Sequence, residues 1–519
     1  MWARARPWLS LRNISHIRCQ HTLRTYKEDS RWPGWEVVVG IEVHAQIKSR
    51  HKLFSNSLTS DLSSPSNTHV SPYDAAFPGT LPRLNPKCVE LGVRTAIALN
   101  SNVQPRSAFD RKHYFYSDLP SGYQITQHYA PIATRGTLRL PSAGTEVRIT
   151  QIQLEQDTGK STFDARHHLS AIDLNRAGTG LMEIVSEPDM RSPEEAGEYV
   201  RMLQAVLRSV GSSDGNMEQG SLRCDVNVSV NKPGGPPGTR CEIKNINSVK
   251  FMMIAITCEV FRQIEVLQKG GSVVQETRGF NEDTASTYSL RSKEDAPDYR
   301  YMPDPNLPPL LLDEGYIARI REGMPELPDA TKSRLLEQGL TARDADVLMS
   351  IDMGREVGYD GKLGLGAVAY FDTVSTGRNP KVVVNWITHE LLGQLSLRHE
   401  TFKDNSLSPE QLGELIDLVE ENKLTGTAGK NLLRHMIANR SKEHPLQLAK
   451  NLSLLSQSGD IAALEEWCKA AIEGLPDEVK SYRNGNANVL NRLIGRVMKV
   501  SKGRANAKDT RALLQQLLQ

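Results

Sequence analysis

Paired cysteines, long apolar runs and a strong net charge are all missing from this sequence. No C-x-x-C spacing occurs among its cysteines, which argues against a structural zinc site and against a disulfide framework. This cysteine usage fits a reducing compartment or an organelle matrix. No apolar run approaches the length of a membrane span. The net charge is only +2, so any patch that binds nucleic acid must be local.

Acidic side chains are missing before Glu28. The segment from Met1 to Lys27 is rich in arginine, and its apolar residues could line one side of a helix. An Arg-rich, acid-free, amphipathic segment is typical of a mitochondrial transit peptide, and the continuous apolar core of a secretory signal is absent. We expect a transit peptide over residues 1–30 and a location in the mitochondrial matrix. A disordered basic arm is the alternative.

The length of 519 residues exceeds what a single hydrophobic core serves, so several domains are expected. Residues 35–312 alternate strands, loops and helices. Residues 313–395 are mainly helical and form a linker domain, and residues 405–519 form a separate helical tail domain. The stretch from Asp110 to Tyr129 predicts a long loop, dense in aromatic and charged side chains, that covers or lines a site.

The stretch EVVVGIEVHAQI, Glu36 to Ile47, reads as a strand because β-branched residues and a period of two dominate it. Side chains two apart share a face, so Glu42 and His44 stand side by side. A carboxylate beside an imidazole can form half of a divalent-metal site. A solvated outer face of an edge strand would look the same.

Other segments extend this picture. Val147 to Glu155 predicts a strand, and a Gly-broken turn precedes a strand on which Leu181, Glu183, Val185 and Glu187 share a face. LRCDVNVSV and RCEIKNIN flank a Pro/Gly turn and predict an antiparallel hairpin. Helices are expected over residues 87–99, from Ser192 to Gly211 with a capping box, and over residues 248–269. The fold class is therefore α+β, with an antiparallel sheet whose one face packs on helices.

The other face of that sheet would present a mixture of acids and bases. It would carry Glu42, His44, Arg223, Asp225, Glu242 and Lys244, with Glu155 and Glu183 nearby if their strands join it. Hard oxygen ligands hold Mg²⁺, and cations neutralise a transferred phosphoryl group. The pattern fits Mg²⁺ and phosphate chemistry, and a solvated sheet face is the alternative.

The DTGKS stretch, Asp157 to Ser161, resembles the end of a phosphate-binding P-loop. The full signature needs Gly five residues before Gly159, where this chain has Leu154. The residues that follow are mostly polar and do not predict an apolar helix. A Walker-type fold is therefore not expected.

Several long motifs resemble, in the right order, those of the B subunits of the aspartyl/glutamyl-tRNA(Asn/Gln) amidotransferases. They are GIEVHAQ, FDRKHYFYSDLPSGYQITQ, LEQDTGKS, DLNRAGTGLMEIVSEPD, MEQGSLRCDVNVSV, EIKNINS, DYRYMPDPNLPPL, NPKVVVNWITHELL and IGRVMKVSKGRAN. The resemblance covers nearly the whole chain after the transit segment. One departure is Gly180, in the turn before Leu181, where the family usually has Pro. The substitution bears on the rigidity of this turn and not on the chemistry.

The resemblance implies a glutamine synthetase-like catalytic domain over residues 35–312 and ATP-dependent conversion of Glu-tRNA(Gln) to Gln-tRNA(Gln). Members of the family use ATP and Mg²⁺ to phosphorylate the γ-carboxylate of the tRNA-bound glutamate. Ammonia from a partner, the amidase (A) component of the enzyme, then displaces phosphate, and a small third subunit bridges the other two. No amidase signature is evident in this chain, so ammonia would come from the partner.

We expect Glu42, His44, Glu155, Glu183 and Glu218 to be metal ligands or their neighbours. Arg176, Arg223 and Lys244 are candidates for holding ATP phosphates or the acyl phosphate, and structural ion pairs are the alternative for each. Glu42, His44, Arg176, Arg223 and Lys244 together form the expected catalytic set.

The last segment is locally basic, as expected for a tail domain that grips tRNA in the family. The residues concerned are Lys430, Arg434, Arg440, Lys442, Arg483, Arg492, Arg496, Lys499, Lys502, Arg504, Lys508 and Arg511. A solvated helical face is the alternative. Two other functions stay open: a small-molecule amide ligase that acts without tRNA, and a non-catalytic docking subunit.

Overall fold

A computed structural model describes residues 26, 28–61, 63–292, 298–455, 461–483, 486–501 and 505–518. Most of the expected transit segment, residues 1–30, lies outside the described residues. Within the described part of the chain, no helix is both long and apolar enough to cross a membrane. The chain divides into two compact units, and the central strand β1 contributes to both.

The first strand is confirmed as β1, Glu36–Gln46. Its alternation is that of a strand with one buried face: Ile41, Val43 and Ala45 are buried, whereas Glu42 and His44 are only partly covered. Residues up to Ile41 belong to one compact unit and those from Glu42 to the other. The acid and imidazole predicted from the sequence therefore lie in the second unit.

The first unit contains the strand order β14-β13-β12-β11-β1. The predicted hairpin is confirmed, because β11 (Leu222–Asn231) pairs antiparallel with β12 (Cys241–Ile246). The strands β13 (Glu276–Asn281) and β14 (Ser286–Ser292) follow, with β12 and β13 parallel. The helix α3 (Val249–Gln268) contacts β12 and β14.

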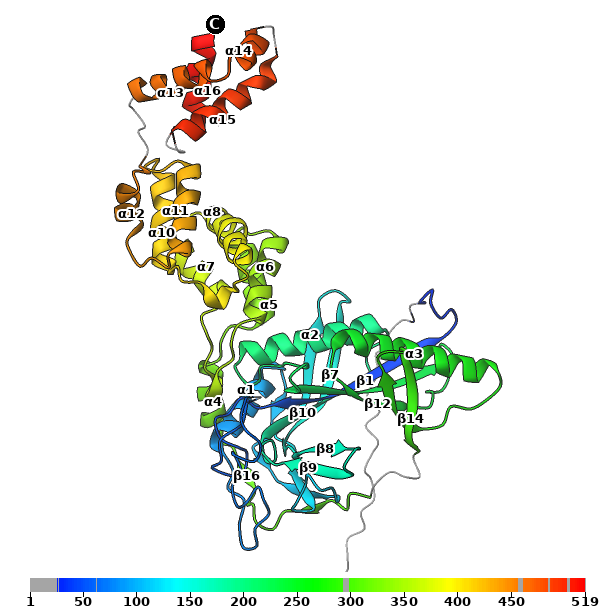
Figure 1. Cartoon of the computed structure of the whole chain (residues 1–519). Helices are drawn as coiled ribbons and strands as arrows, with labels where there is room; N and C mark the ends of the chain where they lie inside the picture. Colours follow the sequence, from blue (N-terminus) through cyan, green and yellow to red (C-terminus); the bar gives the residue numbers. More distant parts are fainter. Residues whose placement is uncertain are drawn as a thin grey trace, which may run out of the picture. The chain divides into compact units, whose positions relative to one another are not determined.

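The second unit contains the order β1-β10-β7-β6-β2, and its strands pair antiparallel. Their bounds are Gly180–Ser186 for β10, Thr145–Gln156 for β7, Ala133–Leu140 for β6 and Asn102–Val103 for β2. The helix α1 (Pro86–Ala98) contacts β7, β6 and β2 (Figure 1). The predicted α+β class is confirmed, with a largely antiparallel sheet and helices towards the C-terminus.

The helix α2, Pro193–Ser209, begins as its sequence predicts. Ser192 Oγ accepts a hydrogen bond from the Glu195 backbone N–H at 3.1 Å. The Glu195 carboxylate accepts from the Arg191 N–H at 2.8 Å, so it satisfies a backbone donor at the helix start.

The prediction of one long loop from Asp110 to Tyr129 is wrong in part. This segment forms a hairpin of β4 (Asp110–His113) and β5 (Tyr123–Thr126), and β15 (Met302–Pro303) pairs with β4. The strands escaped sequence reasoning because each has only four residues and the side chains of β4 do not alternate in polarity. The DTGKS stretch runs into a strand, β8 (Lys160–Asp164), which pairs with β9 (Leu169–Asp173), so no Walker-type helix follows it.

A separate short ladder joins β3 (Arg106–Ser107) to β16 (Leu310–Leu311), which pair antiparallel.

The C-terminal half is helical, as predicted, and has two separate apolar cores. The first core draws on residues 335–449 and the second on residues 468–518. Around the first lie α5 (Pro328–Glu337), α6 (Ala342–Met353), α7 (Ala367–Ser375), α8 (Pro380–Asn385), α9 (Leu392–Leu397), α10 (Pro409–Glu420), α11 (Gly426–Ala438) and α12 (Pro445–Asn451), whereas α4 (Glu314–Glu322) contacts α1. Around the second lie α13 (Ile461–Glu473), α14 (Pro476–Arg483), α15 (Leu490–Val500) and α16 (Ala507–Leu518) (Figure 1).

Candidate functional site

Three neighbouring strands bring four of the predicted site residues together. Glu42 and His44 come from β1, Glu183 from β10 and Glu155 from β7. His44 pairs directly with Glu183 in the β1–β10 register, and Glu155 pairs with Leu181, two residues from Glu183. Side chains that face each other or sit diagonally across antiparallel strands are within reach of one another. The register of the sheet therefore assembles the cluster.

The atoms of this cluster lie close together. His44 Nε2 is 3.6 Å from Glu42 Oε1 and 4.0 Å from Glu183 Oε2. Glu155 and Glu183 are buried, at 2% and 8% exposure. One ligand atom each of His44, Glu155 and Glu183 falls within 4.8 Å of the others. We call His44, Glu42, Glu155 and Glu183 the carboxylate cluster.

Negative charge dominates the electrostatics of the cluster. Burial, together with the charges of Glu155 and Glu42, raises the pKa of the Glu183 carboxyl well above its ordinary value. Glu155 Oε2 is buried and accepts no hydrogen bond from the described residues. A divalent cation would relieve both conditions, because carboxylate oxygens and an imidazole nitrogen are ligands for such ions. The residues present therefore fit Mg²⁺.

Two residues that sequence reasoning missed hold Glu155 in place. Gln124, on β5, donates from Nε2 to Glu155 Oε1 at 2.6 Å. Lys112, on β4, places Nζ 3.9 Å from Glu155 Oε2. Burial opposes the charge on Lys112, but Glu155 and Glu183 raise its pKa above the ordinary value. The density of polar residues in the segment 110–129 was the available signal, and it did not single out either side chain.

The two candidate arginines of this unit converge on another residue that was not predicted, Asp157. Arg223 Nη2 lies 2.8 Å and Arg176 Nε 3.6 Å from Asp157 Oδ2, and Gln46 donates to the same oxygen at 3.2 Å. Burial favours the neutral carboxyl, yet Arg223 and Arg176 hold the pKa of Asp157 below its usual range. Both arginines are only partly buried, so their guanidinium groups brace Asp157 and still reach solvent.

Two predicted site residues remain, Lys244 and Glu218. In the first unit, Lys244 Nζ is 2.7 Å from Asp225 Oδ2 and 3.1 Å from Glu242 Oε1. Burial opposes its charge, and these carboxylates nevertheless raise the pKa of Lys244. Glu218 lies exposed in a turn before β11 and is in neither group of metal-ligating side chains found among the described residues.

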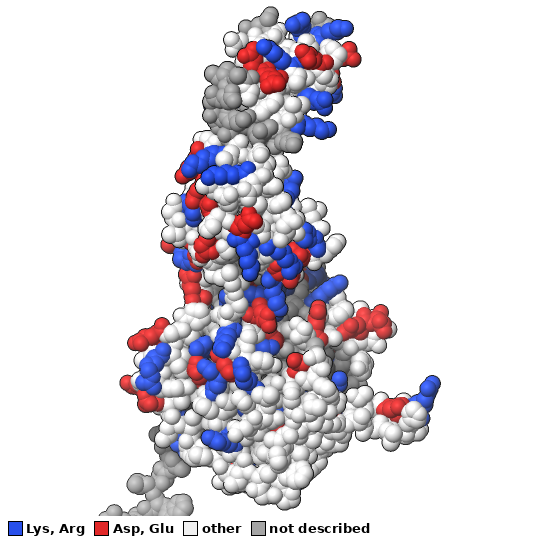
Figure 2. All heavy atoms as spheres, turned by 60° about the vertical axis from the view of Figure 1, so that its left-hand side comes forward, with Lys and Arg blue, Asp and Glu red and all other residues white. Residues whose placement is uncertain are grey.

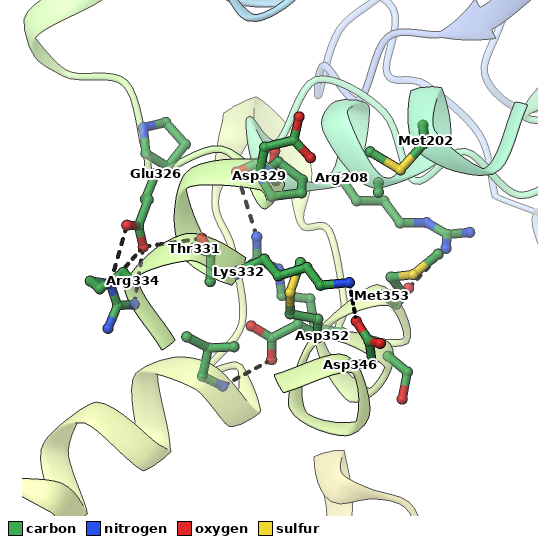
Figure 3. A pocket seen from close by; sticks show the side chains of 18 of the residues that line it. Met202, Arg208, Glu326, Asp329, Thr331, Lys332, Arg334, Asp346, Asp352 and Met353 are labelled. Atoms are coloured by element: carbon green, nitrogen blue, oxygen red, sulfur yellow. Dashed lines mark hydrogen bonds and ion pairs between the residues drawn. The ribbon is translucent and has the colours of Figure 1, made fainter. Parts of the chain in front are cut away.

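A cavity of about 440 Å³ lies beside α2, α5, α6 and α7, away from the residues of the carboxylate cluster. Met202 and Arg208 line it from α2, and Lys332, Asp346 and Met353 from α5 and α6 (Figure 3). Lys332 Nζ is paired with Asp346 Oδ1 at 2.7 Å. None of the residues predicted for the metal or phosphate site lines this cavity.

Basic side chains of the helical part are partly neutralised. Figure 2 shows Lys and Arg interspersed there with Asp and Glu. Lys430 pairs with Glu390 at 2.5 Å, and Arg440 with Glu400 at 3.2 Å. Lys502 and Arg504 lie outside the described residues. The basic character of the tail is therefore a mixture of paired and exposed cations.

Comparison with known proteins shows the protein family to which this chain belongs. The model of the GatB/GatE catalytic domain matches residues 37–318, and that of the GatB domain matches residues 369–518. The B subunit of the mitochondrial glutamyl-tRNA(Gln) amidotransferase of Laccaria bicolor is 60% identical, over 96% of this chain and 95% of its own length. That of Mycosarcoma maydis is 47% identical over 92% and 86%. The B subunit of the aspartyl/glutamyl-tRNA(Asn/Gln) amidotransferase of Granulibacter bethesdensis is 43% identical over 93% and 97%.

The chain is therefore a ligase subunit of an amidotransferase, a class of enzyme built from several subunits. Within that class it belongs to the GatB family, as its sequence motifs predict.

Proposed function

We propose that this chain catalyses the ATP-dependent conversion of Glu-tRNA(Gln) to Gln-tRNA(Gln). The observation that carries the proposal is the convergence of His44, Glu155 and Glu183 from three strands on one point, where a buried carboxylate oxygen accepts no hydrogen bond from the described residues. The relatives' names and the family match support the same substrate. The sheet with a polar, acid-rich face supports a glutamine synthetase-like catalytic domain.

The reaction has two balanced steps. The γ-carboxylate of the tRNA-bound glutamate attacks the γ-phosphorus of ATP, so that a carboxylate–phosphorus bond forms and the bond to the ADP oxygen breaks. Ammonia then attacks the acyl carbon, phosphate leaves with the bonding electrons, and the nitrogen loses a proton. The first step is needed because a free carboxylate has no leaving group that ammonia can displace.

The chain's own residues divide between metal and phosphate. Glu42, His44, Glu155 and Glu183 would hold Mg²⁺, which supplies screening of the phosphate charges when bound. Glu218 is a more distant candidate for this set. Lys112 stabilises the negative charge at Glu155. Arg176, Arg223 and Lys244 would neutralise the phosphates of ATP or of the acyl phosphate, with Asp157 orienting both arginines.

The helical tail, residues 405–519, would bind tRNA through its exposed Lys and Arg side chains. The amidase partner would supply ammonia, and a small third subunit would join the amidase to this chain.

Residues 1–30 would direct the chain to the mitochondrial matrix, and fusing them to a fluorescent protein tests this. The boundaries of the catalytic domain (35–312) and linker domain (313–395) stay predictions.

The test is amidation of Glu-tRNA(Gln) by the chain copurified with its partners, using ATP, Mg²⁺ and free ammonium. Ammonium replaces the amidase, so only the chemistry of this chain is measured. Glu155→Gln and Glu42→Gln are the test variants. Glu146→Gln is the matched control, because Glu146 lies on the same strand β7 and is exposed.

We expect the wild type and the control to be active and the two test variants to lose about 100-fold or more in rate while still binding tRNA. Equal activity of all variants would mean that the carboxylate cluster is not the metal site. Binding of tRNA without any amidation in the wild type would favour a docking subunit. Amidation of free glutamate would favour a small-molecule ligase.

A further inference from the structure

A connected series of aromatic rings lies next to the carboxylate cluster. The rings of Tyr116 and Tyr114 are 5.7 Å apart, those of Tyr114 and Tyr299 5.9 Å, and those of Tyr299 and Tyr301 6.0 Å. Tyr301 stacks on His128 at 3.9 Å with an interplanar angle of 8°. We call Tyr114, Tyr116, His128, Tyr299 and Tyr301 the ring series.

The middle of the ring series is tied to the carboxylate cluster. Tyr114 Oη donates to Gln124 Oε1 at 2.8 Å, and Gln124 in turn donates to Glu155 at 2.6 Å. Lys112 Nζ lies 5.1 Å from the centre of the Tyr299 ring and 3.9 Å from Glu155. Burial, opposed by Lys112 but helped by Glu155 and Glu183, raises the pKa of Tyr301 to about 12.

The outer end of the series is open to solvent. Tyr116 is 64% exposed, and its neighbour Phe115 is 85% exposed. A cavity of about 560 Å³ lies beside them, and it is lined by His113, Tyr114, Phe115, Tyr116, Asp298, Arg300 and Met302. Single exposed apolar residues are ordinary, whereas neighbouring exposed rings beside a cavity are typical of a binding surface.

The backbone holds Phe115 in this exposed position. Gly122 has a φ of +72°, and a Cβ atom there would lie 3.0 Å from Phe115 Cε1. The Phe115 ring therefore packs directly on a turn that only glycine accommodates without strain. The turn covers only a small part of the Phe115 ring, which leaves a flat aromatic surface open to a ligand that stacks.

We propose that the ring series and Phe115 form a stacking platform for the unpaired 3′-terminal bases of the aminoacylated tRNA. The inference rests on the proposed function and assigns the residues that guide its substrate. Every base has an aromatic face, and unpaired bases stack on Phe, Tyr and His side chains. Because the amino acid is attached to the last nucleotide, bases stacked from Tyr116 inward lead the γ-carboxylate towards Glu155 and Glu183.

The test compares binding of two RNAs to the amidotransferase assembled around the full chain. One is intact tRNA(Gln), and the other is the same tRNA without its three terminal nucleotides. The variant Phe115→Ala/Tyr116→Ala removes two exposed rings, and Phe115→Tyr/Tyr116→Phe keeps both. Phe77→Ala is the matched control, because the Phe77 ring is also exposed, at 62%, in a loop outside the series.

We expect the alanine variant to weaken binding of intact tRNA on the order of 10-fold and to leave binding of the shortened tRNA unchanged. The ring-conserving variant and the Phe77 control should bind both RNAs as the wild type does. An equal loss for both RNAs would overturn the proposal. So would a raised KM for ATP with unchanged tRNA binding, since the rings would then hold the adenine of ATP.

Failure of the proposed function remains distinguishable from failure of the platform. The binding comparison needs no catalysis, so it scores the rings even if the wild type shows no ammonium-dependent amidation. If amidation occurs and the alanine variant binds intact tRNA normally, the platform is refuted while the proposed function stands.

Discussion

His44 on β1 lies directly opposite Glu183 on β10, with Nε2 and Oε2 4.0 Å apart. The pair exists because the antiparallel register places residue 44 across from residue 183. A register shift of one residue would turn each side chain of β10 to the other face of the sheet. The metal-binding function that we propose is therefore a property of strand pairing as much as of residue type.

Gln124 provides a way to test the support of the metal site without removing a ligand. Its Nε2 donates to Glu155 Oε1 at 2.6 Å and to the Gln156 carbonyl at 2.5 Å. Gln124→Met keeps the side-chain length and removes both bonds, together with the one that Gln124 accepts from Tyr114 Oη. We expect the Mg²⁺ concentration needed for half-maximal amidation to rise by about 10- to 100-fold, because hydrogen bonds to a ligand orient it. Titration of activity with Mg²⁺ measures this.

The exposed Gln338, at the end of α5, offers the control Gln338→Met, which should titrate like the wild type. An unchanged Mg²⁺ titration for Gln124→Met, in protein that folds normally, would show that Glu155 needs no partner to bind the ion.

Arg223 and Asp157 allow phosphate binding to be separated from structural pairing. Arg223→Met removes a positive charge, whereas Asp157→Asn removes the carboxylate that orients it at 2.8 Å. We expect Arg223→Met to raise the KM for ATP by about 10-fold, the usual size of a lost charge-assisted hydrogen bond. Asp157→Asn should mainly lower stability, because it leaves two guanidinium groups without their shared partner. Steady-state kinetics and thermal unfolding of both variants provide the measurements.

If both variants lower the midpoint of unfolding to the same extent and leave the KM for ATP unchanged, Arg223 is a structural partner of Asp157 only.

Much of the sheet and all four residues of the carboxylate cluster could be predicted from the sequence. The strand around Glu42 and His44 was predictable because its alternation is regular, and Glu155 and Glu183 followed once their strands joined it. Lys112 and Asp157 were not predictable. Lys112 lies on a strand without polarity alternation, and Asp157 gains its role from Arg176 and Arg223, which are distant in the sequence. Long-range pairing of charges leaves no local pattern.

The Lys52–Asp74 ion pair predicts a pH dependence of stability. Both side chains are buried, at 0% and 1% exposure, with Lys52 Nζ 3.2 Å from Asp74 Oδ2. Burial lowers the pKa of Lys52 below 10.5, although Asp74 partly opposes this. The unfolded chain therefore binds the proton more tightly than the folded chain. The free energy of unfolding should therefore increase as the pH rises from the lowered pKa of Lys52 in the folded chain to about 10.4, the ordinary pKa of an unfolded lysine. This contribution is lost as the pH falls through the lowered pKa.

Lys52→Met removes this titration and leaves Asp74 buried without a cation. We expect it to cost about 3–5 kcal/mol at neutral pH, the usual cost of breaking a buried pair. The difference in unfolding free energy between the wild type and Lys52→Met should grow as the pH rises from the lowered pKa of Lys52 to about 10.4. Urea unfolding at several alkaline pH values measures it, and a difference that shrinks with rising pH would contradict the direction.

The helix cap beside Gly366 allows the stability of the helical half to be tested at one position. Asp352 accepts hydrogen bonds from the Ala367 and Val368 N–H groups and so caps α7. A Cβ atom on Gly366 would lie 2.5 Å from Asp352 Oδ1, which forces the carboxylate away. Gly366→Ala should therefore lower the free energy of unfolding by about 1–2 kcal/mol, the value of a lost helix cap.

Gly393→Ala is the control, because a Cβ atom there meets nothing within 4 Å. It should be neutral or slightly stabilising, since alanine favours the helix. Thermal unfolding of the two variants should shift in opposite directions or by clearly different amounts, whereas equal shifts would mean that Asp352 does not act as the cap.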